Sequence, residues 1–369
     1  MIPTFNTTDC TGSSAPLRED SVHFLFEQSN KTPMRRIIFF LLSIPLCLSA
    51  QPQLHGITKQ RHFKTDVPPG NYSGIAYLGD SLYAVVSDKS PQDGFFLFRL
   101  HINLKSGKLH RVDNLGFFGS GRDGRDAEGI AYFPGRRTLL VCGEKDNRIL
   151  EHTLSGQHTG REVALPPVFS GTRSNCGLES ITFQPADTTF WVTTEATLKA
   201  DGDISAPNHP VKNRLRLLAI DSLLRPKAQY AYQMDAPKAH RKAARYAMGV
   251  SELLALPDGY LLVLEREVYV PKKKLGAFAR CKLYVVNPSE GEPIDENEPL
   301  SDASPYLQKT LFCEWRTRLT LLGRKFANYE GMCLGPRLEN GAHAIVLMSD
   351  SQNQYHGVLR DWFKILVVQ

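Results

Sequence analysis

Acidic residues recur at two positions along this chain, each beside an apolar run. The chain contains five pairs of apolar runs, and a turn joins the two runs of each pair. A polar residue stands at the start of the first run, and a second polar residue stands at the end of the second run. The first position holds Ser73, Glu128, Glu179, Glu252 and Glu330, and the second holds Asp88, Glu144, Glu195, Glu265 and Asp350. Nine of these ten residues are carboxylates, which is more than chance placement explains.

Carboxylates that crowd one another repel, and this raises their pKa values unless a cation compensates them. Oxygen ligands from several strands suit calcium, which binds six to eight oxygens in a flexible geometry. We therefore predict a calcium site with the ligands Asp88, Glu128, Glu179, Glu252, Glu330 and Asp350. The alternative is structural, because such acids can also accept hydrogen bonds from backbone N–H groups and tie neighbouring elements together.

Basic residues follow three of the second-position acids, namely Lys89, Lys145 and Arg266. Together with bound cations, they could hold a phosphate group that the acids alone would repel. A water molecule would then attack the phosphorus while a carboxylate accepts its proton. The predicted catalytic residues are Glu128, Glu330, Lys145 and Arg266, with Arg214 as a further candidate for binding phosphate.

Other catalytic motifs have less support in the sequence. Ser251 lies in Gly249-Val250-Ser251-Glu252-Leu253, which lacks the second glycine of a nucleophile elbow. Ser73 has no evident histidine partner, so a carboxylesterase that uses either serine is a weaker hypothesis. No histidine spacing indicates a metal site or a catalytic dyad, and the Walker, GxGxxG and zinc-protease motifs are absent.

The elements that would position the acids are β-hairpins. Each pair of apolar runs flanks a polar turn, which predicts two antiparallel strands. In such a pair the start of the first strand and the end of the second lie at the same edge. Two further strand-like runs follow each hairpin except the last, after which only Trp362–Val368 remains.

The missing strand of the last repeat has a candidate donor near the other end of the chain. Gly56–Lys64 precedes the first hairpin and belongs to no hairpin of its own. Its pairing with Trp362–Val368 would close five four-stranded blades into a ring, which is typical of an all-β propeller. Six blades remain an alternative if a long loop hides one. The first strand of each propeller blade lines the central channel, so the predicted acids would meet at one mouth.

The composition is that of a globular chain, with 42% hydrophobic residues and a formal net charge of +6 over 369 residues. Its basic residues are mostly scattered, which argues against nucleic acid as a partner. One basic cluster, Lys238–Arg245, is either a solvated loop or helix or a wall of an anion-binding cleft. We expect a monomer that acts on a small-molecule ester.

The N-terminal region contains an export signal that begins at an internal methionine. Met34-Arg35-Arg36 is a basic segment, Ile37–Leu48 is an apolar run, and Leu48-Ser49-Ala50 is a small-residue cleavage site. We therefore expect residues 1–33 to be a mis-called extension, 34–50 a signal peptide and 51–369 one domain. The protein would be periplasmic or secreted, without a membrane span after cleavage; an uncleaved single-pass anchor is the alternative.

Five cysteines remain in the expected mature chain, and none has the spacing of a zinc site. Cys142 and Cys333 lie in apolar runs, which indicates buried small hydrophobic residues. Cys281 and Cys313 could pair across adjacent outer strands in an oxidising compartment.

The hairpins resemble those of the bacterial family called esterase-like activity of phytase, or phytase-like domain proteins. The matching segments follow the expected order along nearly the whole mature chain: Ser73–Ala76 with Ser87-Asp88, Asp126–Ala131, Asn175–Ile181, Gly249–Arg266 and Asn328–Asp350. The resemblance implies an exported propeller hydrolase that acts on phosphate esters or related esters, with calcium as its cofactor. One difference is that Ser351-Gln352-Asn353 follows the last Ser-Asp, where the family often has Asp-Asn.

The resemblance identifies no nucleophile, and a shared fold does not determine function. The alternative is a non-catalytic propeller of the cell envelope that binds a ligand or a protein partner at the same mouth. Calcium-dependent turnover of a phosphate ester would distinguish the two.

Overall fold

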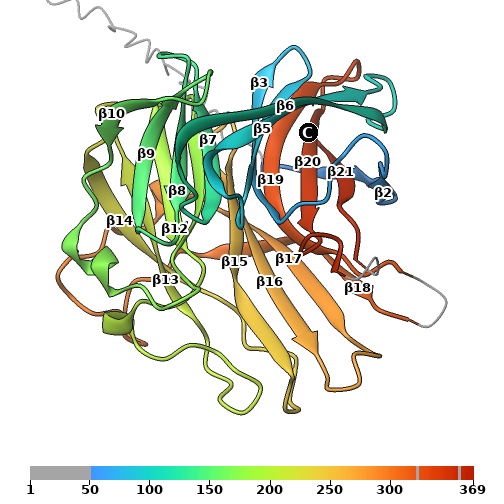
Figure 1. Ribbon diagram of the computed structural model, residues 1–369. Coiled ribbons are helices and arrows are strands. Elements are labelled where there is room, and N and C mark those ends of the chain that lie inside the picture. Colours follow the sequence, from blue (N-terminus) through green and yellow to red (C-terminus); the bar gives the residue numbers. More distant parts are fainter. Residues whose placement is uncertain (1–50, 321–323, 356–358) are drawn as a thin grey trace, which may run out of the picture. The chain divides into compact units, whose positions relative to one another are not determined.

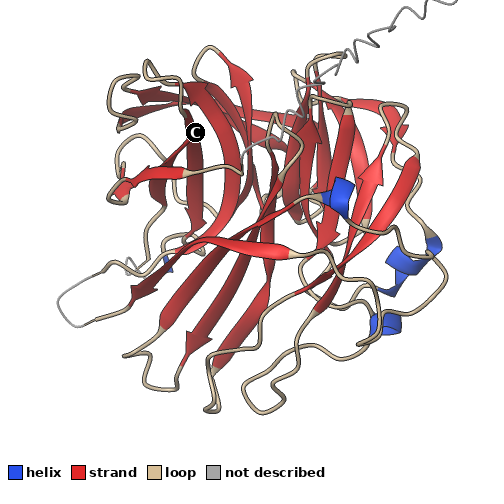
Figure 2. Ribbon diagram, turned by 180° about the vertical axis from the view of Figure 1, so that it is seen from behind, coloured by secondary structure: helices blue, strands red, loops and turns tan. Residues whose placement is uncertain are grey.

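β-Strands make up nearly all of the regular structure of this protein (Figure 1, Figure 2). The computed structural model describes residues 51–320, 324–355 and 359–369, all within a unit that spans 49–369. The predicted N-terminal extension and signal peptide lie outside the described residues. The helices of the described residues are three short 3-10 segments, η1 (Pro167–Gly171), η2 (Lys199–Asp201) and η3 (Pro288–Glu290). None of them is long and apolar enough to cross a membrane.

The strands form five antiparallel blades in chain order. Blade 1 contains β3 (Tyr72–Gly79), β4 (Leu82–Ser87), β5 (Gln92–Ile102) and β6 (Leu109–Asp123). Blade 2 contains β7 (Ala127–Phe133), β8 (Thr138–Gly143), β9 (Arg148–Thr153) and β10 (His158–Glu162). Blade 3 contains β11 (Leu178–Gln184), β12 (Thr189–Thr194), β13 (Arg214–Ile220) and β14 (Pro226–Gln233).

Blade 4 has long strands, and blade 5 combines both ends of the described chain (Figure 1). Blade 4 contains β15 (Arg245–Ala255), β16 (Leu261–Val270), β17 (Phe278–Val286) and β18 (Lys309–Arg318). Blade 5 contains β19 (Asn328–Arg337), β20 (His343–Asp350) and β21 (Trp362–Val368), with β1 (Leu54–Ile57) and β2 (Arg61–His62) both paired to β21.

The blades close into a ring. The first strands of neighbouring blades contact one another in the order β3, β7, β11, β15, β19 and back to β3. The N-terminal strands β1 and β2 complete blade 5 by antiparallel pairing with β21. The predicted all-β propeller of five four-stranded blades, closed by the N-terminal segment, is therefore confirmed, and the described loops contain no sixth blade.

Apolar residues fill the spaces between neighbouring blades. The second strand of each blade is buried along nearly its whole length, because each blade packs against a neighbour on both sides. One cluster joins blade 1 to blade 5, where Tyr72, Tyr83 and Phe98 belong to the same core as Phe363. Closure of the ring is therefore a matter of side-chain packing as well as of strand pairing.

Two local features complete the description of the fold. The outer strand of blade 2, β10, begins at His158 and ends at Glu162. The basic segment before β15, predicted to be either a solvated loop or helix or a wall of an anion-binding cleft, is a loop. The backbone N–H groups of Lys238 and Ala239 both donate to Glu267 Oε1, so a side chain replaces the helical carbonyl partners.

The cysteines of the described residues are all free thiols. Cys142 and Cys333 are buried, as predicted. Cys281 and Cys313 lie on adjacent strands, but Cys281 is opposite Trp315 and Cys313 is opposite Leu283. This offset in register explains why the suggested disulfide is not formed.

Candidate functional site

A β-bulge occurs at the same place in the first strand of every blade. The register shifts lie after Tyr72, Ala127, Leu178, Val250 and Tyr329. A bulge adds an unpaired residue and redirects its side chain. The first residue within each bulge is Ser73, Glu128, Glu179, Ser251 and Glu330, in blade order. These bulges define the inner half of the site.

The second strands supply the other half. In the same register, the residue that follows the bulge partner is Asp88, Glu144, Glu195, Arg266 and Asp350 in the five blades. We call these ten residues the mouth ring. It contains seven carboxylates, two serines and one arginine.

Blade 4 corrects the prediction at both of its positions. Glu252 and Glu265 were assigned to the mouth, but they lie one residue away from it, and Ser251 and Arg266 hold the equivalent positions. The physical reason is that β16 continues to Val270, so no strand ends at Glu265. A shift of one residue turns a strand side chain to the other face.

Glu252 instead joins three blades beneath the mouth. It is buried, and its carboxylate accepts hydrogen bonds from Ser180 Oγ in blade 3 and from the backbone N–H of Met332 in blade 5. Burial raises its pKa well above the usual range. In blades 1, 2 and 5 the equivalent position holds glycine, which allows close contact with the neighbouring strand. Glu252 is thus a structural residue rather than a ligand at the mouth.

Glu265 faces the outer part of blade 4. Its carboxylate accepts hydrogen bonds from the hydroxyl of Tyr232 at 2.8 Å and from Lys309 Nζ at 2.5 Å. Asp235 lies in the same group, where Lys309 Nζ is 3.0 Å from its Oδ1. These contacts pair the buried acid with a cation and leave it outside the mouth ring.

Arg266 lies among the carboxylates of the mouth ring. Its guanidinium donates hydrogen bonds to Glu330 of blade 5 and to Glu195 of blade 3, and its Nη2 is 4.0 Å from Glu179 Oε1. The side chain is only 5% exposed. Its Nε is buried and makes no hydrogen bond within the described residues. Arg266 therefore compensates several acids and keeps one unused donor.

Three acids of the mouth ring, Glu128, Glu179 and Asp350, have strongly raised pKa values. Burial and the neighbouring Asp88 and Glu330 raise the pKa of Glu128 well above its usual range. Burial and Glu330 have the same effect on the pKa of Asp350, and burial and Glu195 on that of Glu179. One arginine is therefore insufficient to compensate this group of acids.

A cavity of about 560 Å³ opens beside Arg266, Glu330 and Asp350. Much of its wall is apolar: Ala247, Val268, Val270, Ala277, Leu319 and Phe326. Arg245, Lys272 and Lys274 also line it. The wall exists because β15 and β16 stay paired beyond the mouth ring as far as Arg245 and Val270. The cavity combines an ionic floor, an apolar wall and a basic rim.

The other predicted basic residues do not reach this cavity. Lys145 is exposed and does not line it. Lys89 contacts Asp88 at 2.6 Å and Asp126 at 3.2 Å, at the edge of the mouth ring. Arg214 bonds to Asp302 at 2.7 Å, away from the mouth. Arg266 and Glu330 line the cavity, whereas Glu128 belongs to the mouth ring but does not line it.

The serines of the mouth ring show no arrangement for nucleophilic catalysis. Ser251 Oγ is buried and lies 3.4 and 3.3 Å from the carbonyl oxygens of Leu264 and Tyr329. Ser73 Oγ donates to Glu330 Oε2 at 3.5 Å. Neither has a histidine partner among its hydrogen bonds in the described structure.

The mouth ring fits calcium in ligand type and in charge. Its donors are carboxylate oxygens, which calcium prefers, and their raised pKa values indicate uncompensated negative charge. It is not a closely packed cage. In the described part of the chain, only one group of three acidic, histidine or cysteine side chains places its ligand atoms within 4.8 Å of one another, and it lies elsewhere. Water would therefore have to complete the coordination.

That other group consists of Asp93, His152 and His158, and it was not predicted from the sequence. Asp93 lies in blade 1 and the two histidines lie in blade 2. The five residues between the histidines lie at the upper limit of the spacing typical of zinc-binding histidines, which is a sequence signal for this group, and the hairpin places the two residues opposite each other. Only the packing of two blades brings the carboxylate to the imidazoles.

One family of known proteins matches most of this chain. A model of the family described as Phytase-like, esterase-like activity of phytase, matches residues 67–352. No curated protein matches the chain.

Several solved structures are similar at low identity. A luciferin-regenerating enzyme is 10% identical over 84% of this chain and 95% of that chain, with a TM-score of 0.41. The WD40 β-propeller domain of Doa1 is 13% identical over 86% of this chain and 97% of that chain, with a TM-score of 0.30. Hydrazine synthase of Kuenenia stuttgartiensis is 11% identical over 81% of both chains, with a TM-score of 0.34. These values support no inference about function. The family model, however, covers most of the chain, and this protein therefore belongs to the phytase-like family described as esterase-like activity of phytase.

Proposed function

We propose that this protein is an ester hydrolase with its active site at the mouth ring, and that it acts on phosphate monoesters that carry an apolar group. The observation that carries the proposal is the cavity of about 560 Å³, in which Arg266, Glu330 and Asp350 adjoin an apolar wall. Binding sites for small molecules are commonly apolar clefts with a few convergent polar groups. A highly charged substrate would leave that wall without a role.

The basic residues would bind the phosphate group. Arg266 lines the cavity and has an Nε donor that makes no hydrogen bond within the described residues. Arg245, Lys272 and Lys274 lie around the same cavity and add positive charge. Arginine donors form strong, oriented hydrogen bonds to phosphate oxygens. The apolar part of the ester would lie against Val268 and its neighbours.

Asp350 is the best placed general base. It lines the cavity, and burial together with Glu330 raises its pKa, so its ionised carboxylate is a stronger base than that of an ordinary aspartate. Water would attack the phosphorus as Asp350 accepts its proton, the bond from phosphorus to the alcohol oxygen would break, and the leaving oxygen would take up a proton. The hydrogen bond that Arg266 donates to Glu330 would hold the guanidinium in position.

Calcium fits this site as a cofactor. Of the predicted ligands, Asp88, Glu128, Glu179, Glu330 and Asp350 lie in the mouth ring, and Asp88, Glu128 and Glu330 would hold the ion while Asp350 acts as base. When bound, calcium would supply positive charge that offsets the acids and the incoming phosphate.

A substitution that narrows the cavity tests the proposed substrate class. We expect Ala247→Phe to raise the KM for 1-naphthyl phosphate by about tenfold or more while methyl phosphate is hydrolysed as before, because the new ring would occupy space used by the naphthyl group. Ala186→Phe, in the exposed β11–β12 turn, serves as the control. Equal effects on both substrates would contradict the assignment of the apolar wall. A wild-type protein that binds these esters without turnover would favour the non-catalytic propeller.

A further inference from the structure

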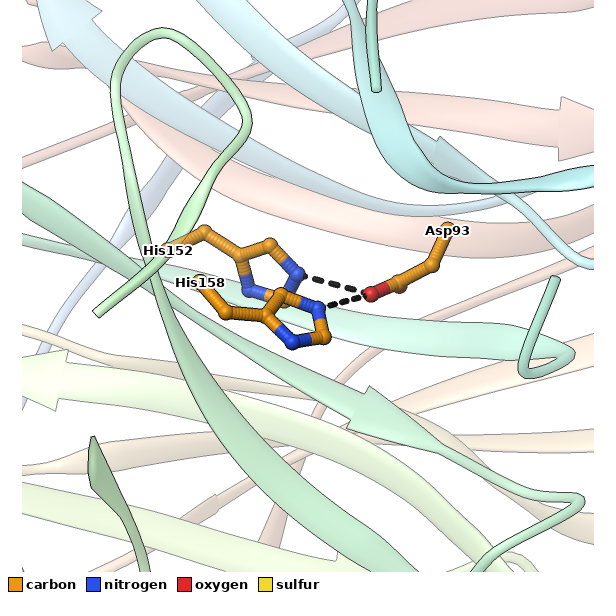
Figure 3. Close-up of side chains that lie close together, drawn as sticks. All are labelled: Asp93, His152 and His158. Atoms are coloured by element: carbon orange, nitrogen blue, oxygen red, sulfur yellow. Dashed lines mark hydrogen bonds and ion pairs between the residues drawn. The ribbon is translucent and has the colours of Figure 1, made fainter. Parts of the chain in front are cut away.

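Asp93, His152 and His158 converge on one point between blades 1 and 2 (Figure 3). His152 Nε2 is 3.0 Å from Asp93 Oδ2, and His158 Nε2 contacts the same oxygen. The two imidazole rings are nearly perpendicular, with centroids 4.4 Å apart. Each residue thus offers one ligand atom to a common centre. The three residues lie on β5, β9 and β10, which are outer strands and belong to no part of the mouth ring.

The cluster is enclosed but not sealed. The side chains of Asp93 and His152 have no exposed surface, and that of His158 is 9% exposed. Buried polar side chains normally satisfy their hydrogen-bonding atoms. Asp93 Oδ1, however, is buried and accepts no hydrogen bond within the described residues. This oxygen is a second potential ligand atom on the same carboxylate.

A backbone carbonyl fixes the orientation of the His152 ring. His152 Nδ1 lies 3.2 Å from the carbonyl oxygen of Leu150, which can only accept a hydrogen bond, so Nδ1 donates it. The other nitrogen, Nε2, is thereby directed at Asp93 Oδ2. A metal ion at this point would take Nε2 and the carboxylate oxygen as ligands. A carbonyl bonded to the remote nitrogen is also the usual support of a metal-binding histidine.

Arg125 compensates Asp93 only in part. Arg125 Nη1 is 3.7 Å from Asp93 Oδ1, but its Nε and Nη2 donate to Asp146 at 2.6 and 3.0 Å. One arginine therefore serves two acids.

We propose that Asp93, His152 and His158 bind a divalent transition metal ion, with zinc as the best match, and that this ion fastens blade 1 to blade 2. Two imidazole nitrogens and one carboxylate oxygen form a ligand set that suits zinc and its neighbours in the first transition series, not calcium or magnesium. Three protein ligands leave a fourth position for water. The proposal is independent of the hydrolase activity.

Zinc binding to the purified protein tests this inference. We expect titration calorimetry with zinc chloride to show one site, and thermal unfolding to shift upward with zinc, because an ion that binds only the folded state stabilises it. His158→Gln should weaken zinc binding by about 100-fold or more. His101→Gln is the matched control, since His101 Nε2 forms a similar contact of 2.7 Å with Asp113 on the exposed side of blade 1. It should bind zinc as the wild type does.

Two further measurements separate binding from folding defects. Cobalt(II) added to the wild-type protein should give the visible absorption bands of a low-coordinate site without thiolate charge-transfer bands, which requires no variant. Asp350→Asn should keep zinc binding, because it alters only the mouth ring. Wild-type protein that shows no saturable zinc binding, or His158→Gln that binds zinc unchanged, would show that the three residues form only a hydrogen-bonded contact between blades.

Discussion

Arg266 shows how one residue determines the character of the mouth. Its sequence position follows an apolar run in the same way as Asp88 or Glu195, and the structure places it in the same register. An arginine there pairs with Glu195 and Glu330, which belong to the two neighbouring blades. The sequence identified Arg266 as a candidate because it is basic and follows an acid. The sequence could not show that Arg266 takes the place of the acid in the mouth ring, because the neighbouring Glu265 also stands at the end of an apolar run.

Removing the guanidinium should destabilise the protein strongly. We expect Arg266→Met to lower the free energy of unfolding by about 3–5 kcal/mol, because it leaves buried carboxylates without a partner. Urea unfolding followed by circular dichroism measures this. The control is Arg280→Met, which removes a more exposed pair with Glu314 and should cost about 1 kcal/mol or less. Equal losses in the two variants would contradict the central role of Arg266 in the mouth ring.

The bulge at the start of each first strand is the element that builds the site. Four of the five blades combine a mouth residue with a small residue directly after it, and in three of them that residue is glycine: Gly74, Gly129 and Gly331. The glycines lie against the backbone of the neighbouring first strand. The hairpins and their shared edge could be predicted from apolar periodicity and turns. The bulges could not be predicted in this way, because the alternation of apolar and polar residues is intact on either side of each bulge.

Blade 4 shows the consequence. Glu252 occupies the position of those glycines. It was predicted to lie in the mouth because, in the sequence, it matches the carboxylates of the other first strands. Its hydrogen bond with Ser180, the other non-glycine residue at this position, explains how the two bulkier side chains are accommodated. Sequence alone does not reveal this pairing, since the two residues are distant along the chain and belong to different blades.

The close contact of these glycines with the neighbouring strand can be tested by substitution. A Cβ atom at Gly331 would lie 2.2 Å from the carbonyl oxygen of Ser73, a distance that requires the backbone to move. We expect Gly331→Ala to lower the free energy of unfolding by about 1–3 kcal/mol. Gly56→Ala in β1 meets nothing within 4 Å and serves as the control. Comparable stability of the two variants in urea would show that the strands do not pack as closely as described.

Across the whole molecule, the channel concentrates negative charge in a protein whose formal net charge is +6. Fold class, blade number and closure could be predicted because each rests on a repeated pattern of apolar runs. The cavity and the cluster of Asp93, His152 and His158 could not, because both depend on the packing of neighbouring strands or blades. Apart from the spacing of His152 and His158, their residues share no pattern along the chain.

This concentration of charge predicts an unusual dependence of stability on pH. Burial raises the pKa of Asp361 to about 6, and burial also raises the pKa values of Glu128, Glu179 and Asp350. The folded protein therefore keeps protons that the unfolded chain has released above about pH 4, so the free energy of unfolding falls as pH rises through the folded-state pKa values. In a chelator, we expect stability to be about 1–3 kcal/mol greater near pH 5.5 than near pH 7.5.

The same pH experiment with added calcium provides the comparison for the measurements in the chelator. At the higher pH, added calcium should recover stability, since it compensates the ionised acids of the folded state. Urea unfolding at both pH values, with and without calcium, measures this directly. A stability that rises steadily between these pH values in the chelator would show that the acids of the mouth ring are already compensated within the protein.

The hydrolytic role of the mouth is tested most directly by kcat/KM for 1-naphthyl phosphate in the wild type, Asp350→Asn and Glu314→Gln. Asp350→Asn keeps the shape of the side chain but removes the proposed base, so we expect kcat to fall by about 100-fold or more with thermal stability maintained or increased. Glu314→Gln, which alters an ion pair on the outer strand of blade 4, should retain wild-type activity. Full activity in Asp350→Asn, or no turnover by the wild type with calcium present, would contradict the proposed hydrolase.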